Sequence, residues 1–181
     1  MLNKDKIKEA EANVIAYLNE GLLKKAVSDP NAIKVLIKNA RESILSAEKL
    51  DSSKTSDLWV IVCSYYAMFY ITNAVLHKLG YKVGDKIAHK VTSDAMIVYA
   101  RKKLKESMLE EYEDIKEEAL NLAGLKADSL IESFEFEKGK RNKIQYTTDE
   151  IEKQSKAKTS LKRAKEFVFE MEKFLASLKV Y

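Results

Sequence analysis

Hydrophobic residues recur every three or four positions along most of this chain, and polar residues fill the positions between them. Such spacing places the hydrophobic side chains on one face of a helix. The pattern predicts six helical segments, at about residues 4–27, 30–50, 57–79, 87–104, 109–137 and from about residue 148 onwards. No segment shows the alternation typical of a strand. We therefore expect an all-α fold, an up-and-down helical bundle of four core helices with one or two extra helices.

The third segment, residues 57–79, is the most hydrophobic and is predicted to be the central helix of the bundle. Ser64, Thr72, Asn73 and three tyrosines interrupt its hydrophobic run, so we do not expect a membrane span. A chain of 181 residues is expected to form a single domain, residues 1–181. Residues 1–28 are interpreted as an added N-terminal helix.

Composition narrows the class of protein further. With 46% hydrophobic residues, one proline and five glycines, the chain is neither disordered nor rich in loops. Its 32 basic and 28 acidic residues give a net charge of +4, which permits contact with nucleic acid but does not require it. A single cysteine excludes an internal disulfide. No signal-peptide pattern is present, and we expect a cytoplasmic protein.

A basic stretch, KGKRNKIQYTTDE at residues 138–150, interrupts the helical pattern. One interpretation is a solvated hinge, in which lysines gather near the negative end of a helix dipole. The other is a binding site, in which an arginine holds a phosphate, lysines attract it and a tyrosine stacks on a base. Spacing alone favours the hinge. The candidate binding residues are Lys138, Lys140, Arg141, Asn142, Lys143 and Tyr146.

Other candidates for chemistry are weaker. His77 and His89 are the only histidines, and a metal site formed with Asp85 or Asp94 is one hypothesis. More simply, His77 interacts favourably with a helix C-terminus and His89 makes local hydrogen bonds. No cofactor is expected, since a glycine-rich phosphate loop is absent from the sequence. No metal is expected, since the chain has one cysteine and lacks the Glu-x-x-His pattern of carboxylate-bridged sites. The acidic run at residues 110–118 is interpreted as a solvated helix face, or alternatively as a docking surface for a basic partner.

Two motifs together resemble the HEPN superfamily (higher eukaryotes and prokaryotes nucleotide-binding), a group of small α-helical bundles. The first is SYYAMFYITNAVLHKLGY, residues 64–81, followed eight residues later by His89. The second is RNKIQY, residues 141–146, just before the last helix. The resemblance implies a homodimer in which both copies of the arginine motif face a shared cleft. It also implies functions such as RNA cleavage in toxin–antitoxin pairs, nucleotide binding, or action beside a small nucleotidyltransferase.

The second motif departs from that of the ribonuclease members, in which four to six residues separate the arginine from a histidine. Tyr146 stands at the first of these positions, and this version resembles a branch of small stand-alone prokaryotic members. A tyrosine, with an ordinary pKa of about 10, is a poor general base at neutral pH.

We therefore expect a homodimeric nucleotide- or RNA-binding module whose site is lined by Arg141, Asn142 and Tyr146. One alternative is a metal-independent ribonuclease in which Arg141 and Tyr146 are catalytic. Another is a bundle that binds a nucleotidyltransferase partner. The sequence leaves open whether the chain is an enzyme.

Overall fold

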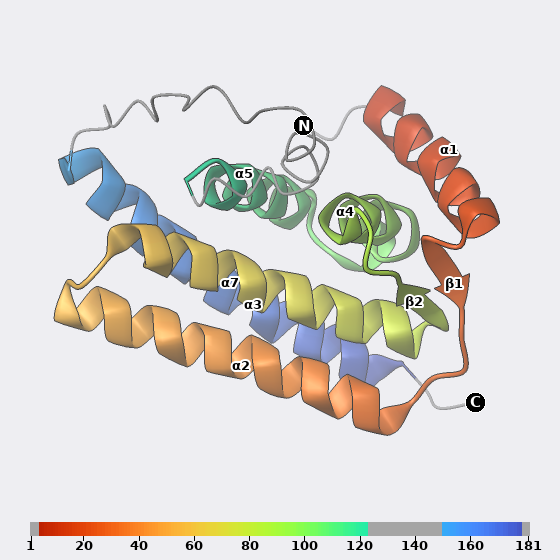
Figure 1. Cartoon of the computed structure of the whole chain (residues 1–181), viewed down its shortest axis with the longest axis horizontal. Coiled ribbons are helices and arrows are strands. Elements are labelled where there is room, and N and C mark those ends of the chain that lie inside the picture. Colours follow the sequence, from red (N-terminus) through yellow and green to blue (C-terminus); the bar gives the residue numbers. More distant parts are fainter. Residues whose placement is uncertain (1–3, 123–149, 179–181) are drawn as a thin grey trace, which may run out of the picture.

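The computed structural model describes residues 4–122 and 150–178. The elements in chain order are α1 (Lys4–Glu20), β1 (Leu23–Lys25), α2 (Pro30–Ser53), α3 (Asp57–Lys78), β2 (Tyr81–Val83), α4 (Ala88–Tyr99), the short 3-10 helix η1 (Arg101–Lys103), α5 (Glu106–Leu122) and α7 (Glu150–Ser177). The six α-helices among the described residues pack as a bundle (Figure 1). The prediction of an all-α helical bundle is thus confirmed.

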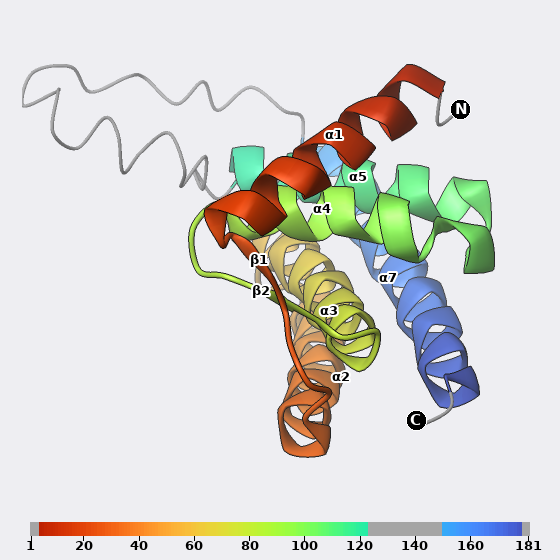
Figure 2. The same ribbon diagram turned by 90° about the vertical axis from the view of Figure 1, so that its right-hand side faces the viewer.

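The central helix of the bundle is α3, as the sequence predicted. It contacts α2, α7, α5 and α4, and Ile61, Tyr65, Met68 and Ile71 on it are fully buried. Helices α2 and α7 run alongside α3, whereas α4 and α5 cross above this layer (Figures 1 and 2). By length and composition alone α3 would also suit a membrane span, but 61% of its most hydrophobic 18-residue window is buried inside the protein.

Local signals explain where α2 and α3 begin. The Asp29 carboxylate caps α2 by accepting a hydrogen bond of 2.9 Å from the backbone N–H of Asn31, and Pro30 occupies the first turn. Ser56 caps α3 in the same way, accepting from the backbone N–H of Trp59. Along α2, the small side chains of Ala40 and Ala47 are completely buried, which lets α2 lie close against α3.

The structure corrects the prediction that the chain contains no strands. Leu23–Lys25 pairs antiparallel with Tyr81–Val83, so the first helix ends at Glu20 and does not continue to residue 27. Gly21 leaves the helix with a φ of +72°, a conformation that side chains with a Cβ atom disfavour. Each strand has only three residues, which is too short for a two-residue alternation to be visible in the sequence.

A second, smaller hydrophobic cluster joins α1 to α4. It consists of Val14, Tyr17, Leu23, Leu76, Val91 and Ala95. Beside it, the Asp94 carboxylate accepts hydrogen bonds from Tyr17 Oη at 2.9 Å and from Asn13 Nδ2 at 3.0 Å. Helix α1 therefore lies across α4 and reaches the rest of the protein mainly through it (Figure 2).

Three further predicted boundaries differ from the structure or lie outside the described residues. The fourth segment, expected at residues 87–104, is helical only to Tyr99 and continues as η1. The fifth begins at Glu106, and the part beyond residue 122, expected to reach residue 137, lies outside the described residues. Helix α7 begins at Glu150, so the predicted start near residue 148 lies outside them as well.

Candidate functional site

The candidate binding residues of the basic stretch belong to residues 123–149 and lie outside the described residues. They are Lys138, Lys140, Arg141, Asn142, Lys143 and Tyr146. In the chain this segment connects the end of α5 at Leu122 to the start of α7 at Glu150. The arginine-centred site therefore stays a prediction, and so does the shared cleft of a homodimer.

The structure joins the two parts of the first motif through a hydrogen bond. On α3, the hydroxyl of Tyr65 lies 2.7 Å from Nδ1 of His89, the second residue of α4. Phe69 packs against the same imidazole, with ring centroids 4.8 Å apart. Because Tyr65 is fully buried and Tyr112 lies beside it, its pKa is raised far above the ordinary value and its hydroxyl stays protonated. His89 therefore bonds across helices, not locally as the sequence suggested.

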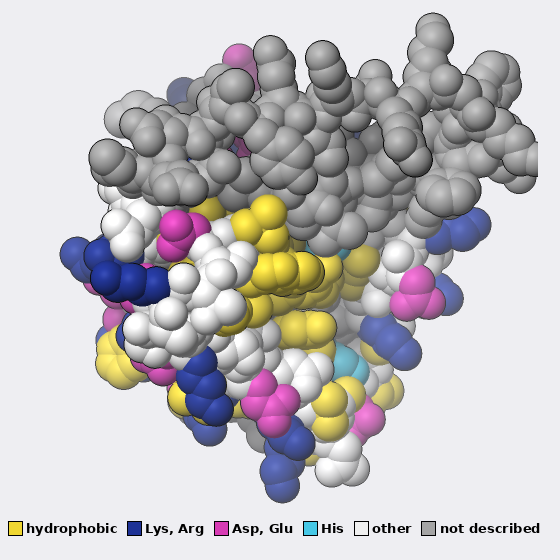
Figure 3. Space-filling model, turned by 60° about the vertical axis from the view of Figure 1, so that its left-hand side comes forward, with side chains coloured by type: hydrophobic (Ala, Val, Ile, Leu, Met, Phe, Trp, Pro, Cys, Tyr) yellow, Lys and Arg dark blue, Asp and Glu magenta, His cyan; other side chains and the backbone are white. Residues whose placement is uncertain are grey.

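A groove opens beside this contact, between α2, α3, β2 and the start of α4. Its volume is about 660 Å³. On its wall lie the rings of Tyr66, Phe69 and Tyr70 from α3, together with aliphatic side chains of α2. We call this site the aromatic groove. Figure 3 shows a hollow lined by hydrophobic side chains, with histidine beside it, on one face of the protein.

Polar groups of the aromatic groove come from four places. Asp29 caps α2, Asn73 and His77 lie on α3, His89 lies in the first turn of α4, and Lys82 and Asp85 lie on β2 and the loop after it. The amide of Asn73 is already engaged, since it donates to the carbonyl of Phe69 and to Thr92 Oγ1. His77 differs: only 8% of it is exposed, and its Nδ1 has no hydrogen-bond partner in the described part of the chain.

The histidines do not form a recognisable metal centre. Both line the aromatic groove, and Asp85 lines it too, but no group of three or more histidine, cysteine or acidic side chains suited to a metal occurs among the described residues. The other candidate ligand, Asp94, instead holds Tyr17 and Asn13 of α1. His77 does stand in the last turn of α3, where the sequence placed it as a partner of the helix dipole.

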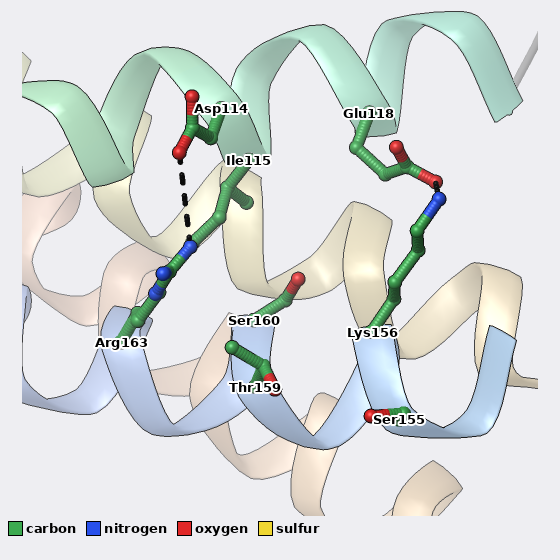
Figure 4. Close-up of a pocket in the computed structure, with 8 residues that line it drawn as sticks. All are labelled: Asp114, Ile115, Glu118, Ser155, Lys156, Thr159, Ser160 and Arg163. Atoms are coloured by element: carbon green, nitrogen blue, oxygen red, sulfur yellow. Dashed lines mark hydrogen bonds and ion pairs between the residues drawn. The ribbon is translucent and has the colours of Figure 1, made fainter. Parts of the chain in front are cut away.

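The acidic run on α5 is more than a solvated helix face. Tyr112 and Ile115 within it are buried, and two of its carboxylates, Asp114 and Glu118, face α7 across a small polar pocket of about 210 Å³ (Figure 4). There Lys156 pairs with Glu118 at 3.4 Å, and a 3.8 Å ion pair joins Arg163 to Asp114. Since these cations are neutralised by neighbouring carboxylates, the pocket offers little attraction for a phosphate.

Reasoning from the sequence missed the aromatic groove. The hydrophobic pattern of residues 57–79 assigns Phe69 to the buried stripe and Tyr66 and Tyr70 to an extension of it, whereas all three are half-buried and line the groove. A signal was present in their spacing. Three aromatic residues at i, i+3 and i+4 lie on one face of a helix, and the buried stripe of α3 already occupies another face.

No protein-family model matches the chain, and no match was found among curated proteins or solved structures. The structure establishes a helical bundle with a two-stranded clasp. The likeness to a particular superfamily therefore rests on the two sequence motifs.

Proposed function

We propose that this chain is a HEPN-like helical bundle that forms a homodimer and binds a nucleotide or RNA at a site centred on Arg141. One observation carries the proposal. Tyr65 of the signature helix and the downstream His89, which the resemblance groups together, are hydrogen-bonded at 2.7 Å beside an aromatic groove. The two parts of the first motif are thus in direct contact in the fold. The arginine motif precedes α7 in the chain, and α7 packs against the same signature helix, α3.

The chemistry of the basic stretch suits a phosphate. Arg141 offers a planar guanidinium that binds two phosphate oxygens at once. Lys138, Lys140 and Lys143 add attraction, and Tyr146 offers a ring for stacking on a base. Because a tyrosine stands where ribonuclease members have a histidine, binding is favoured over cleavage. A cytoplasmic role in a toxin–antitoxin-type system, with or without a nucleotidyltransferase partner, fits this proposal.

The test is RNA binding measured by fluorescence anisotropy with a labelled single-stranded oligonucleotide. We expect affinity to fall as salt rises, since bound counterions are released. Arg141→Ala is expected to weaken binding about tenfold or more, the loss of one charge-assisted phosphate contact. Arg41→Ala is the matched control, because it also removes one positive charge. Arg41 is an exposed residue of α2 that pairs only with Glu172 among the described residues.

Two results would contradict the proposal: no binding at low salt by a folded dimer, or equal losses in Arg141→Ala and Arg41→Ala. The same samples distinguish the alternatives. RNA cleaved in the presence of EDTA, and left intact by Arg141→Ala and Tyr146→Phe, would show a metal-independent ribonuclease. Co-purification of a nucleotidyltransferase, together with failure to bind RNA, would show a protein-binding bundle. Light scattering measures the oligomeric state.

A further inference from the structure

We propose that the aromatic groove binds one flat nucleobase, supplied either by a free nucleoside or by an unstacked base of RNA. The printed lining of the groove shares no residue with the arginine motif and comes from α2, α3, β2 and the start of α4. That a flat ring binds here follows from the structure of the groove. The choice of a nucleobase among flat rings rests on the proposed function.

The wall of the groove suits a flat ring. Tyr66, Phe69 and Tyr70 form a continuous set of rings, with centroids 5.8 to 6.1 Å apart. Each ring is half-buried, so it is held in place by its neighbours while part of its surface remains accessible. A nucleobase stacks favourably on such a ring, because every base has a flat π face. By contrast, the similarly large groove between α2 and α7, of about 810 Å³, has no aromatic side chain among the described residues that line it.

A hydrogen-bonding group at the edge of the ring is also required. The Nδ1 atom of His77 is buried and lacks a partner in the part of the chain that the structure describes. Leaving a buried polar atom unpaired is unfavourable, and a hydrocarbon ligand would keep it unpaired. A nucleobase carries donors and acceptors along its edge, and an imidazole nitrogen can donate or accept according to its tautomer. A base whose edge reaches this nitrogen would therefore bind better than a hydrocarbon ring of the same size.

Charge in the groove argues against a phosphate as the anchoring group. Among the described residues that line it, Lys82 is the single lysine or arginine, while Asp29 and Asp85 bring two carboxylates. The groove is thus at best neutral towards an anion. Its volume of about 660 Å³ lies within the range of about 300–1,000 Å³ usual for small-molecule sites. The base is the part of the ligand that the groove recognises, and the phosphates stay outside it.

The test is calorimetric titration of the full chain with adenosine, guanosine, cytidine and uridine, and with ribose 5-phosphate as the ligand without a base. At least one nucleoside is expected to bind, and ribose 5-phosphate is not. Tyr70→Leu keeps a large hydrophobic side chain but removes the ring, and should weaken binding about fivefold or more. Phe169→Ala is the control, since this 60% exposed aromatic residue of α7 lies outside the groove.

His77 is tested by two substitutions of the same site. His77→Asn places an amide near the position of Nδ1 and should retain most of the affinity, whereas His77→Leu should lose about fivefold or more. Thermal unfolding of each variant verifies that the protein is folded. Equal effects of the two substitutions in folded protein would overturn the role of the nitrogen, and equal effects of Tyr70→Leu and Phe169→Ala would overturn the groove as the site.

The two sources of the base are separated by the RNA assay. Nucleoside binding that Tyr70→Leu weakens assigns the groove to a free ligand. RNA binding that Tyr70→Leu weakens, without measurable nucleoside binding, assigns it to a base of RNA. If Tyr70→Leu weakens neither nucleoside binding nor RNA binding, the groove proposal is overturned, and the proposed Arg141 site is unaffected. Conversely, nucleoside binding that is unchanged in Arg141→Ala, in a protein that does not bind RNA, would retain the groove and overturn the proposed function.

Discussion

At the scale of single residues, Glu113 is a carboxylate enclosed by three helices. Its side chain on α5 is 19% exposed. It accepts hydrogen bonds from Ser93 of α4 and from Lys116, and forms an ion pair of 3.5 Å with Lys6 of α1. Burial alone would raise the pKa of Glu113, but Lys116, Ser93 and Lys6 together lower it below the ordinary value of 4.5.

This lowered pKa predicts a pH-dependent contribution to stability. A carboxylate whose pKa is lower in the folded state stabilises the protein above its unfolded pKa, and this stabilisation is lost as the pH falls through the folded pKa. Glu113→Gln is therefore expected to reduce the free energy of unfolding at pH 7 by about 1–3 kcal/mol. Below pH 4.5 the difference from the original protein should shrink. Urea unfolding at several pH values measures it.

The control for Glu113 is Glu117→Gln. Glu117 is an exposed residue of the same helix, and no hydrogen bond or ion pair joins it to another described residue. A deficit of Glu113→Gln that persists undiminished at pH 3 would contradict the electrostatic explanation. An equal deficit of Glu117→Gln would show that the effect belongs to the helix and not to the enclosed carboxylate.

At the scale of elements, α1 is attached to the protein differently from the other helices. Two of its three buried residues, Val14 and Tyr17, belong to the smaller cluster, and its polar attachment to α4 centres on Asp94. The main core, by contrast, is made of residues from α2, α3, α4, α5 and α7. We therefore expect local unfolding of α1 to require less free energy than local unfolding of the helices of the main core.

Asp94→Ala is predicted to loosen α1 selectively. Two hydrogen bonds to a charged carboxylate are lost, each of about 1.5–3 kcal/mol, while the main core keeps its contacts. Native-state hydrogen exchange should show faster exchange across Lys4–Glu20 and little change in α2 and α3. Glu9→Ala, an exposed carboxylate of α1 without a described partner, should leave the exchange pattern unchanged. Uniform acceleration along the whole chain would contradict a separately opening α1.

The elements also show what the sequence allowed us to predict. Helices α2 and α3 matched their predicted starts because strong local signals, the Asp29 cap with Pro30 and the polar break before α3, coincide with long hydrophobic stripes. The end of α1 was wrong because Gly21 and a three-residue strand leave no periodic signal. The aromatic groove was missed because exposure depends on which helix face the neighbours cover, and that is a tertiary property. The Arg141 site rests on a motif alone.

At the scale of the whole molecule, the described helices form two layers held by α3. Its adjacent residues Val75 and Leu76 belong to different hydrophobic clusters, since they point to different sides of the helix. One turn of α3 therefore forms part of both cores. The layer with α2 and α7 and the layer with α1 and α4 meet at this helix (Figure 1).

The strand pair has a consequence for the order in which the protein folds. Leu23 and Val83 are partners in β1 and β2, so their pairing closes a loop of roughly 60 residues that contains α2 and α3. If α2 and α3 form first, β1 and β2 come close to each other, because the helical hairpin brings the two ends of this loop together. We therefore expect strand pairing to be a late event in folding.

Folding kinetics provide the measurement. Leu23→Ala is expected to accelerate unfolding and leave the refolding rate nearly unchanged, whereas Ile61→Val in the centre of α3 should slow refolding. Slowed refolding of Leu23→Ala in proportion to its lost stability would reverse the order. The strand pair of β1 and β2 is then expected to form last during folding. By the same argument, it is expected to be the first part of the fold to separate during unfolding.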